Sequence, residues 1–519
     1  MPKAYLTILP DNKKVPLSKN ASLKELIERA GIEISTPCGG RGHCGKCRVR
    51  VVKGHIEPSE ADKRLINKRD LAKGHRLSCQ AHATSPVAVF LPEESRMYHH
   101  DILSAAPSGI KFKRSPLAPA EAGRKRMYGL ALDIGTTTVY GSLVDLKRAV
   151  ELEHGSVFNG QAKYGADVIS RLSYAGGGKG LEELNKAVIS SVNMLIGRLI
   201  KDAGVKHNDI LDIVASGNTV MQHIFLYINP LYLIEPPFHK PFKGSLSAHA
   251  RSLGIKANAF ARVRFLPNVS SFVGSDIVSG ILSTGMGRSP SNALLVDIGT
   301  NGEVAIASKG KIVVASTAAG PAFEGAEIKC GMKASVGAIG SVAIDDGSVR
   351  IETIGGTQAK GICGSGLISS ISALLRSGAI EKSGRMKKRF YLYKGKGKSV
   401  FIDQADVRQV QLAKSAIFTG IEVLMKNAGL KAEDMDHIYI AGAFGSFIDK
   451  RSAIGIGLIP AFDRRKIRFV GNSSLAGAKL ALSSRHAYEE AVKIADRCEY
   501  VELSGNKEFE KGFIESMRF

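Results

Sequence analysis

The chain has 519 residues, room for three or four domain-sized units, and 44% of them are hydrophobic, which suffices for large buried cores. The formal net charge is +24, but no recognised nucleic-acid-binding module and no basic stripe with interleaved aromatic residues occurs, so we expect no nucleic-acid partner. An acidic protein partner or a solvated Lys-rich surface accounts for the charge equally well. No apolar run reaches the roughly 18 residues of a membrane span, and residues 1–10 lack the pattern of a signal peptide, so we expect a cytoplasmic protein with no membrane partner.

The first hundred residues predict a small mixed domain. Strands are predicted at residues 4–9, 14–17, 49–52 and 87–91. Between the second and third strands, Ser22 to Glu25 forms a capping box that opens a helix through Ala30. The segment after this helix carries the first candidate ligands.

Four cysteines in this region have the spacing of metal ligands: Cys38, Cys44, Cys47 and Cys79. They read C-x5-C-x2-C with one more cysteine after 31 residues, which is close to the plant-type [2Fe–2S] pattern C-x4-C-x2-C…C with the first gap one residue longer. Four glycines stand between the first three cysteines: Gly39, Gly40, Gly42 and Gly45. Glycine lets a loop approach the sulfides closely and turn its N–H groups toward them.

A zinc ribbon and a disulfide knot are the alternatives. Zinc usually takes two separated C-x2-C pairs, and only one is present, whereas disulfides require an exported chain. We therefore predict a [2Fe–2S] cluster held by the four cysteines, and hence a one-electron carrier. The order of strands, helix and cluster loop resembles a β-grasp ferredoxin, which we assign to residues 1–96.

Residues 97–126 are predicted to be a linker. The segment contains three prolines and the basic cluster Arg124 to Arg126, and it has little hydrophobic periodicity. A tether of this kind would let the electron-carrying domain reach two partners in turn.

Beyond the linker the chain contains an internal repeat. Residues 130–138 read L-A-L-D-I-G-T-T-T, and residues 294–302 read L-L-V-D-I-G-T-N-G. Both begin as buried strands, turn at a glycine and continue as a second apolar strand. A duplication about 160 residues apart indicates two homologous lobes.

Each repeated hairpin offers ligands for a metal nucleotide. Asp133 and Asp297, the candidate catalytic residues, end their strands where each can face Mg²⁺ or its waters. The adjoining turns supply phosphate-binding donors at Gly135, Thr136, Thr137, Gly299, Thr300, Asn301 and Gly302. A third turn follows a strand at residues 438–440, and its small residues can lie against adenine and ribose: Gly442, Ala443 and Gly445. No P-loop motif is present.

These three motifs resemble the phosphate and adenosine motifs of the acetate kinase, sugar kinase, Hsp70 and actin superfamily. The resemblance implies an α/β multidomain fold in which two RNase-H-like lobes, residues 127–290 and 291–519, close over ATP and Mg²⁺. Residues 361–375 are expected to form a turn and a helix that crosses between the lobes.

The chain as a whole resembles the ATP-dependent reductive activators of corrinoid proteins. Family-like stretches run nearly end to end, at residues 38–49, 159–171, 217–221, 266–276, 318–326 and 411–414. The run G-P-A-F-E-G at residues 320–325 is the most specific of them. Some members have an extra middle domain after the linker, and we expect none here because Asp133 follows the linker directly.

The resemblance implies that one electron passes from the [2Fe–2S] cluster to Co(II) of a corrinoid protein and regenerates Co(I). Plant-type clusters lie near about −400 mV, and each deficit of roughly 59 mV opposes the transfer tenfold, so ATP would supply the difference. The implied partners are the corrinoid subunit of a methyltransferase or a corrinoid iron–sulfur protein, and a low-potential electron donor. A homodimer stays open.

Three alternatives come from other classes: a small-molecule kinase with a redox-sensing ferredoxin domain, an activator of a radical dehydratase, and an actin-type scaffold. The dehydratase activators share a [4Fe–4S] cluster between subunits, which the cysteine pattern does not support, and a ferredoxin domain argues against a scaffold. Cys330, Cys363 and Cys498 lie far apart and are predicted to be buried thiols.

Overall fold

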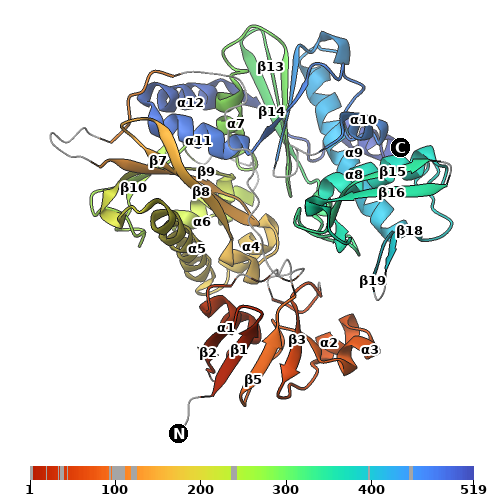
Figure 1. The fold of residues 1–519 in the computed structure, drawn as a ribbon. Coiled ribbons are helices and arrows are strands. Elements are labelled where there is room, and N and C mark those ends of the chain that lie inside the picture. Colours follow the sequence, from red (N-terminus) through yellow and green to blue (C-terminus); the bar gives the residue numbers. More distant parts are fainter. Residues whose placement is uncertain are drawn as a thin grey trace.

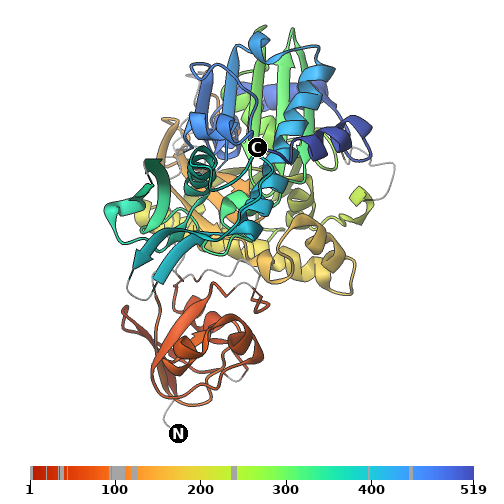
Figure 2. The ribbon, with the colours of Figure 1, turned by 90° about the vertical axis from the view of Figure 1, so that its right-hand side faces the viewer.

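The computed structural model describes residues 4–18, 20–32, 34, 40–43, 45–92, 95, 112–118, 126–234, 242, 244–345, 347–395, 398–442 and 448–519. These residues form a small N-terminal domain and two larger lobes (Figure 1). The N-terminal domain lies at one end of the molecule, below both lobes in Figure 1 and also in the view turned by 90° (Figure 2).

The N-terminal domain is built on a five-stranded sheet in the order β2-β1-β5-β3-β4. Its elements are β1 (Tyr5–Leu9), β2 (Lys13–Pro16), α1 (Leu23–Arg29), β3 (Arg48–Lys53), α2 (Glu60–Leu65), α3 (Lys68–Ala72), β4 (His75–Leu77) and β5 (Val87–Phe90). The predicted capping box opens α1, because Glu25 N–H donates to Ser22 Oγ at 3.2 Å and Ser22 N–H donates to the Glu25 carboxylate at 3.0 Å. β1 pairs in parallel with β5 and antiparallel with β2, as expected of the predicted β-grasp domain.

Each lobe contains one six-stranded sheet, in the orders β10-β11-β9-β6-β7-β8 and β21-β20-β12-β13-β14-β22. The strands of the first lobe are β6 (Tyr128–Ile134), β7 (Thr138–Asp145), β8 (Val150–Phe158), β9 (Ile210–Gly217), β10 (Leu246–His249) and β11 (Arg262–Phe265). The strands of the second lobe are β12 (Ala293–Ile298), β13 (Gly302–Ser308), β14 (Lys311–Thr317), β20 (His437–Ala441), β21 (Ile467–Gly471) and β22 (Cys498–Tyr500).

Five strands of each sheet repeat the same topology. An antiparallel meander, β6-β7-β8 or β12-β13-β14, is extended by two parallel strands, β9 and β11 or β20 and β21. The sequence repeat is therefore a structural repeat, and both lobes have the predicted RNase-H-like arrangement.

Three hydrophobic cores stack around the two sheets. Helices α5 and α6 cover the outer face of the first sheet, α9 covers the outer face of the second, and α7, α11 and α12 fill the space between the sheets (Figure 1). The helices are α4 (Val168–Ala175), α5 (Gly180–Ala203), α6 (Thr219–Phe225), α7 (Ser275–Thr284), α8 (Gly364–Arg376), α9 (Gln404–Asn427), α10 (Lys450–Gly455), α11 (Ser473–Ser483), α12 (Arg485–Arg497) and α13 (Lys507–Glu515).

The helices that pack between the lobes differ from the helix that the sequence predicted there. Helix α8 forms where predicted, but its buried face, including Leu367 and Ile371, packs within the second lobe. The inter-sheet core instead contains α7 and α11, which approach so closely that a Cβ on Gly477 would lie 2.2 Å from the Ser279 carbonyl oxygen. The expectation that α8 crosses between the lobes is therefore wrong.

The second lobe carries two smaller sheets that have no counterpart among the described residues of the first lobe. A three-stranded sheet has the order β16-β15-β17, and a two-stranded sheet pairs β18 with β19. Their strands are β15 (Ala338–Asp345), β16 (Ser348–Thr353), β17 (Gly361–Ile362), β18 (Phe390–Gly395) and β19 (Lys398–Ile402). In the described part of the chain, none of the helices combines the length and apolar character that a bilayer crossing requires.

Part of the predicted linker is anchored to the lobes. Ser115 N–H donates to the Ser483 carbonyl at 3.1 Å, and Arg485 N–H donates to the Ser115 carbonyl at 2.6 Å. Leu117 is buried in the inter-sheet core, and the Arg288 guanidinium lies 4.2 Å from the centre of the Phe112 ring. Residues 112–118 of the predicted linker therefore pack against the lobes.

The three cysteines outside the cluster pattern differ in exposure. Cys363 is buried at the start of α8, whereas Cys330 and Cys498 are only half-buried. The prediction of buried thiols is correct for Cys363 alone.

Candidate functional site

Two of the four predicted cluster ligands lie within the described residues, and their thiols meet. Cys47 immediately precedes β3 and Cys79 follows β4 closely, and because these strands pair antiparallel, the two sulfur atoms come within 3.2 Å. Cys38 and Cys44 lie outside the described residues. The described residues contain no group of three or more His, Cys, Asp and Glu side chains that would hold a metal ion, so the fit of a cluster is judged on this pair and its loop.

The loop around these thiols suits an iron–sulfur cluster. Gly40 and Gly42 have φ values of +86° and +71°, which side chains rarely tolerate, and their carbonyls accept hydrogen bonds from Gln80 at 2.6 Å and Arg64 at 3.0 Å. The hydrogen bond with the Cys79 thiol, together with burial, raises the pKa of Cys47. A cation bound to both sulfur atoms would offset the charge of the ionised thiols, and iron in a [2Fe–2S] cluster would supply such a cation.

The two repeated hairpins face one cleft between the lobes. Nine of the predicted residues line it: Asp133, Gly135, Thr136, Thr137, Asp297, Gly299, Thr300, Asn301 and Gly442. Gly302 is not among the lining residues, because it begins β13 and a Cβ there would lie 2.6 Å from Thr317 Oγ1. Ala443 and Gly445 lie outside the described residues.

The N-terminus of α11 holds both aspartates. Asn472 Nδ2 donates to Asp133 Oδ2 at 2.8 Å, and Ser474 Oγ donates to Asp133 Oδ1 at 2.9 Å. Ser473 Oγ lies 3.4 Å from Asp297 Oδ2. One short segment from late in the sequence thus orients an acidic side chain from each repeat.

Five carboxyl groups gather in the cleft, since Asp276 at the start of α7, Glu303 on β13 and Glu324 after β14 join the two aspartates. Burial raises the pKa of Asp133 to about 6, and burial with the charge of Asp133 raises the pKa of Asp276 to about 7. Burial and the charges of Asp276 and Asp133 raise the pKa of Asp297 to about 7. Burial and the charges of Asp276 and Asp297 raise the pKa of Glu303 well above its usual value. The cleft therefore favours a cation that would offset these charges.

The phosphate-binding turns are tightly constrained. A Cβ on Gly135 would lie 2.5 Å from the Thr138 carbonyl oxygen, and one on Gly442, whose φ is +109°, would lie 2.3 Å from that of Ile298. Both positions therefore require glycine, and both leave the backbone open to the cleft.

A buried arginine supports the first of these turns. The Arg171 guanidinium donates to the Thr136 carbonyl at 2.6 Å and to the Gly165 carbonyl at 3.0 Å, and burial lowers its pKa to about 9. Asn218 Nδ2 donates to Thr136 Oγ1 at 3.1 Å. The turn is thus positioned by side chains from α4 and from the residue that caps α6.

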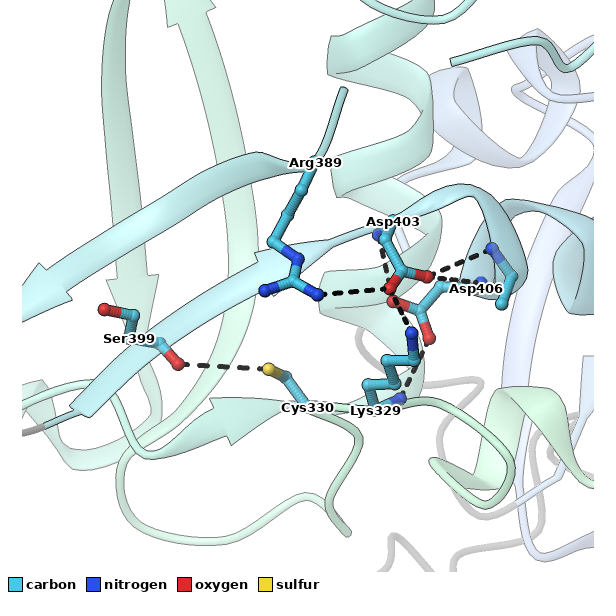
Figure 3. Close-up of polar contacts among 7 residues, drawn as sticks. Lys329, Cys330, Arg389, Ser399, Asp403 and Asp406 are labelled. Carbon is cyan, nitrogen blue, oxygen red and sulfur yellow. Dashed lines mark hydrogen bonds and ion pairs between the residues drawn. The ribbon is translucent and has the colours of Figure 1, made fainter. Parts of the chain in front are cut away.

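A segment of the second lobe forms the rim of the cleft through Met332, Lys333 and Ala334. Figure 3 shows how the start of this segment is held: Lys329 N–H donates to Asp406 Oδ1 at 2.9 Å, and Lys329 Nζ donates to Asp403 Oδ2 at 2.5 Å. Arg389 adds an ion pair with Asp403 at 3.9 Å. Because Asp403 also caps α9, the rim is tied to the longest helix of the second lobe.

The cluster loop contacts both lobes. Arg41 Nη2 donates to the Tyr164 carbonyl of the first lobe at 2.6 Å, and Lys46 Nζ donates to the Gly331 carbonyl of the second lobe. Tyr164 precedes the Gly165 carbonyl that Arg171 holds, and Gly331 precedes the rim segment. Each contact is therefore only a few residues from the cleft.

Sequence reasoning assigned no role to several residues that the structure brings to the cleft: Asn218, Asp276, Glu303, Glu324, Lys333, Asn472 and Ser474. Asn218, Asp276 and Glu324 lie within the family-like stretches, so membership in such a stretch could have indicated these three residues as candidates for the cleft. Asn472 and Ser474 follow a strand and open a helix, a position that gives no local indication of a cleft.

A thiol-bearing β-grasp domain joined to two RNase-H-like lobes with acidic residues in the cleft defines an iron–sulfur protein with an actin-like nucleotide clamp. Comparison with known families agrees. Residues 6–84 match the 2Fe-2S iron-sulfur cluster binding domain, residues 128–289 the RACo middle region, and residues 291–519 the C-terminal domain of RACo, the ASKHA domain.

Individual relatives extend the match to the whole chain. The corrinoid activation enzyme RamQ of Eubacterium limosum is 30% identical and covers 98% of this chain and 97% of its own. A reductase of Methanosarcina barkeri named for the Co(II) methylated amine-specific corrinoid protein is 26% identical over 72% of this chain and 73% of its own. The solved structure of a reductive activator for a corrinoid, iron–sulfur protein is 34% identical, covers 100% of this chain and 98% of its own, and superposes with a TM-score of 0.74.

The chain belongs to the family of reductive activators of corrinoid proteins. The predicted [2Fe–2S] ferredoxin domain and the ATP-binding clamp are confirmed by these matches, and a kinase is not favoured. The segment that we interpreted as the first lobe, directly after the predicted linker, matches the RACo middle region.

Proposed function

We propose that this protein uses ATP to drive one-electron reduction of a corrinoid protein from Co(II) to Co(I), with Mg²⁺ bound beside the nucleotide. The observation that carries the proposal is the contact of one cluster loop with both lobes of a nucleotide clamp. The partner would be a corrinoid subunit of a methyltransferase or a corrinoid iron–sulfur protein.

Electron transfer would begin at the N-terminal domain. When bound by Cys38, Cys44, Cys47 and Cys79, a [2Fe–2S] cluster supplies a carrier for one electron. The Gln80 and Arg64 side chains fix the backbone around it, so the loop needs little rearrangement as the charge changes. A low-potential donor would reduce it.

The cleft residues would hold Mg²⁺ and ATP. Magnesium in nucleotide sites takes one or two carboxylates and completes its shell with phosphate oxygens and waters. Asp133 and Asp297, one from each hairpin, are the carboxylates we assign to it. The turns at Thr136 and Thr300 would donate hydrogen bonds to phosphate, and Gly442 would lie against the nucleoside.

Coupling would run through the loop contacts. Nucleotide bound between the lobes changes the lobe angle if it binds the open and closed states with different affinity. Such a change would move the Tyr164 and Gly331 carbonyls relative to each other. Arg41 and Lys46 could then keep both contacts in only one lobe arrangement, so the nucleotide state would decide whether the cluster loop stays on the lobes or is released toward a partner.

An ATPase assay with and without a corrinoid protein tests the proposal. We expect release of inorganic phosphate without any phosphorylated small molecule, and a stimulated rate when the Co(II) form of the partner is present. Transfer of the γ-phosphate to a metabolite, with no effect of the corrinoid protein, would contradict the proposal and favour the kinase alternative.

A further inference from the structure

One carboxylate in the cleft joins the two repeated hairpins. Glu324 ends the short helix η5 (Ala322–Glu324) that follows β14. Its Oε1 accepts a hydrogen bond from Thr300 Oγ1 at 2.8 Å, and its Oε2 accepts one from Thr137 Oγ1 at 3.2 Å. These threonines belong to the phosphate-binding turns of different lobes, so Glu324 lies between the two sites where phosphate is expected.

The backbone around Glu324 is held in one position. The preceding residue, Phe323, is 1% exposed in the core of the second lobe. The following residue, Gly325, has a φ of +77°, and a Cβ there would lie 2.6 Å from the Met332 carbonyl oxygen. Because neither neighbour can shift easily, the carboxylate is presented to the cleft at a fixed place.

The other acidic side chains of the cleft have different surroundings. Asp133 accepts hydrogen bonds from Asn472 and Ser474, and Glu303 is buried beside Asp297. Glu324 differs because its partners are the hydroxyl groups of the two turns that phosphate would also need. A hydroxyl has a single O–H to donate, so each threonine can serve either Glu324 or a phosphate oxygen.

We propose that Glu324 is the catalytic base of ATP hydrolysis and that the γ-phosphate frees it for this role by taking the hydroxyl donors of Thr137 and Thr300. The assignment rests on the proposed function. A bond forms between the water oxygen and the γ-phosphorus, and the bond from that phosphorus to the β–γ bridging oxygen breaks. The water proton passes to the Glu324 carboxylate and then to solvent, while ADP leaves with the bridging oxygen and inorganic phosphate is the second product.

This arrangement makes hydrolysis depend on phosphate binding at both turns. Without nucleotide, the Glu324 carboxylate keeps its hydroxyl partners from both turns. Once phosphate occupies the turns, the carboxylate is next to the γ-phosphate with its lone pairs available. Orienting a nucleophilic water in this way is the main task left to a protein side chain in phosphoryl transfer.

Glu324→Gln in the full-length, cluster-loaded protein tests the assignment, with Glu327→Gln as the matched control. Glu327 is exposed three residues further on and does not line the cleft. We expect E324Q to bind a fluorescent ATP analogue at least as tightly as the parent, because a negative charge near phosphate is removed. Its single-turnover hydrolysis should fall by at least about 100-fold, whereas E327Q should leave both quantities unchanged. Glu324→Asp, which retracts the carboxylate by one methylene, should hydrolyse at an intermediate rate.

The outcomes separate this assignment from the function it rests on. E324Q that hydrolyses ATP at the parental rate would overturn the catalytic role while leaving the proposed function intact. Loss of nucleotide binding in E324Q, in parallel with loss of hydrolysis, would reduce Glu324 to a structural bridge and also overturn it. Absence of hydrolysis by the parent protein, even with a corrinoid partner, would overturn both.

Discussion

Asp133 and Asp297 occupy equivalent places in two copies of one hairpin, yet their surroundings differ. Across the strand pair, Asp133 faces Tyr140 and Asp297 faces Glu303. Only Asp297 therefore has a carboxylate as its cross-strand neighbour. The two hairpins share a backbone arrangement, but the second hairpin is the more acidic of the two.

Replacing either aspartate with asparagine should lower Mg²⁺-dependent ATP hydrolysis by at least about 100-fold, because each would lose a carboxylate that offsets the cation and orients phosphate. The absorption of the cluster should not change, since the N-terminal domain is separate. Turnover per folded molecule is the quantity to measure. Parental turnover in both variants would show that the aspartates only stabilise their own turns.

In the absence of ligand, Asp297→Asn should increase the stability of the fold at neutral pH, although it lowers ATP hydrolysis. Burial raises the pKa of Asp297 from 3.8 to about 7, so the folded protein holds this proton more tightly than the unfolded chain and loses stability as pH rises from about 4 to about 7. Asp297→Asn removes this loss. In EDTA and without nucleotide, its thermal midpoint relative to the parent should therefore rise between pH 5 and pH 8. A difference between the two midpoints that stays level or falls over this range would contradict the account.

Cys79→Ser should abolish or strongly perturb the visible absorption of the [2Fe–2S] cluster while ATP binding by the lobes persists. The reason is that Cys79 is one of the four proposed thiolate ligands and its sulfur already meets that of Cys47. Cys498→Ser, in the second lobe, is the matched control and should keep the parental spectrum. A normal spectrum in the Cys79 variant would remove this residue from the ligand set.

At the scale of elements, the hairpin repeat could be predicted because its signal is local: a buried strand, a glycine turn and a second strand. The order β12-β13-β14 and the pairing of Asp297 with Glu303 follow directly from it. Which helices lie between the lobes could not be predicted, because an apolar helix face does not show which element it packs against. Helix α8 was assigned that place for its glycine-rich start, whereas α11, whose first turn holds the aspartates, carried no motif.

Gly477→Ala should destabilise the fold by about 1–3 kcal/mol and also reduce ATP turnover, because the added Cβ would push α11 away from α7 and displace Asn472 from Asp133. Gly197→Ala in α5 is the control, since nothing lies within 4 Å of the added Cβ. It should raise stability by roughly 0.5–1 kcal/mol. Chemical unfolding with turnover at matched folded fraction measures both, and equal effects of the two substitutions would contradict this account of the helix contact.

At the scale of the whole molecule, the N-terminal domain is held to the lobes by its cluster loop and by the chain itself. The sequence predicted the tether but not where it attaches, because residues 112–118 lack the periodicity of an element and are fixed by tertiary contacts with residues around α11 and α12. The contacts of Arg41 and Lys46 with backbone carbonyls could not be predicted either. Every residue has a backbone carbonyl, so residue type does not show which one accepts a hydrogen bond.

Separating the chain into fragments 1–96 and 112–519 should leave the first fragment reducible but strongly lower ATP-dependent reduction of the partner at micromolar concentration. A covalent connection holds the domain near the lobes at roughly millimolar effective concentration, which dilute fragments do not reach. Residues 1–95 carry 17 Lys and Arg against 10 Asp and Glu, so activity of the intact protein should also fall as ionic strength rises. Full activity of dilute fragments without any salt dependence would show that neither the connection nor the basic charge matters.

The visible spectrum of a corrinoid protein under anaerobic conditions tests the central claim most directly. The Co(II) form is mixed with this protein and a low-potential reductant, with and without MgATP. We predict conversion of the Co(II) bands to those of Co(I) only when ATP is present, and no conversion with Cys79→Ser or Asp133→Asn. Reduction at the same rate and extent without ATP, or none under any condition with a series of corrinoid partners, would contradict the account.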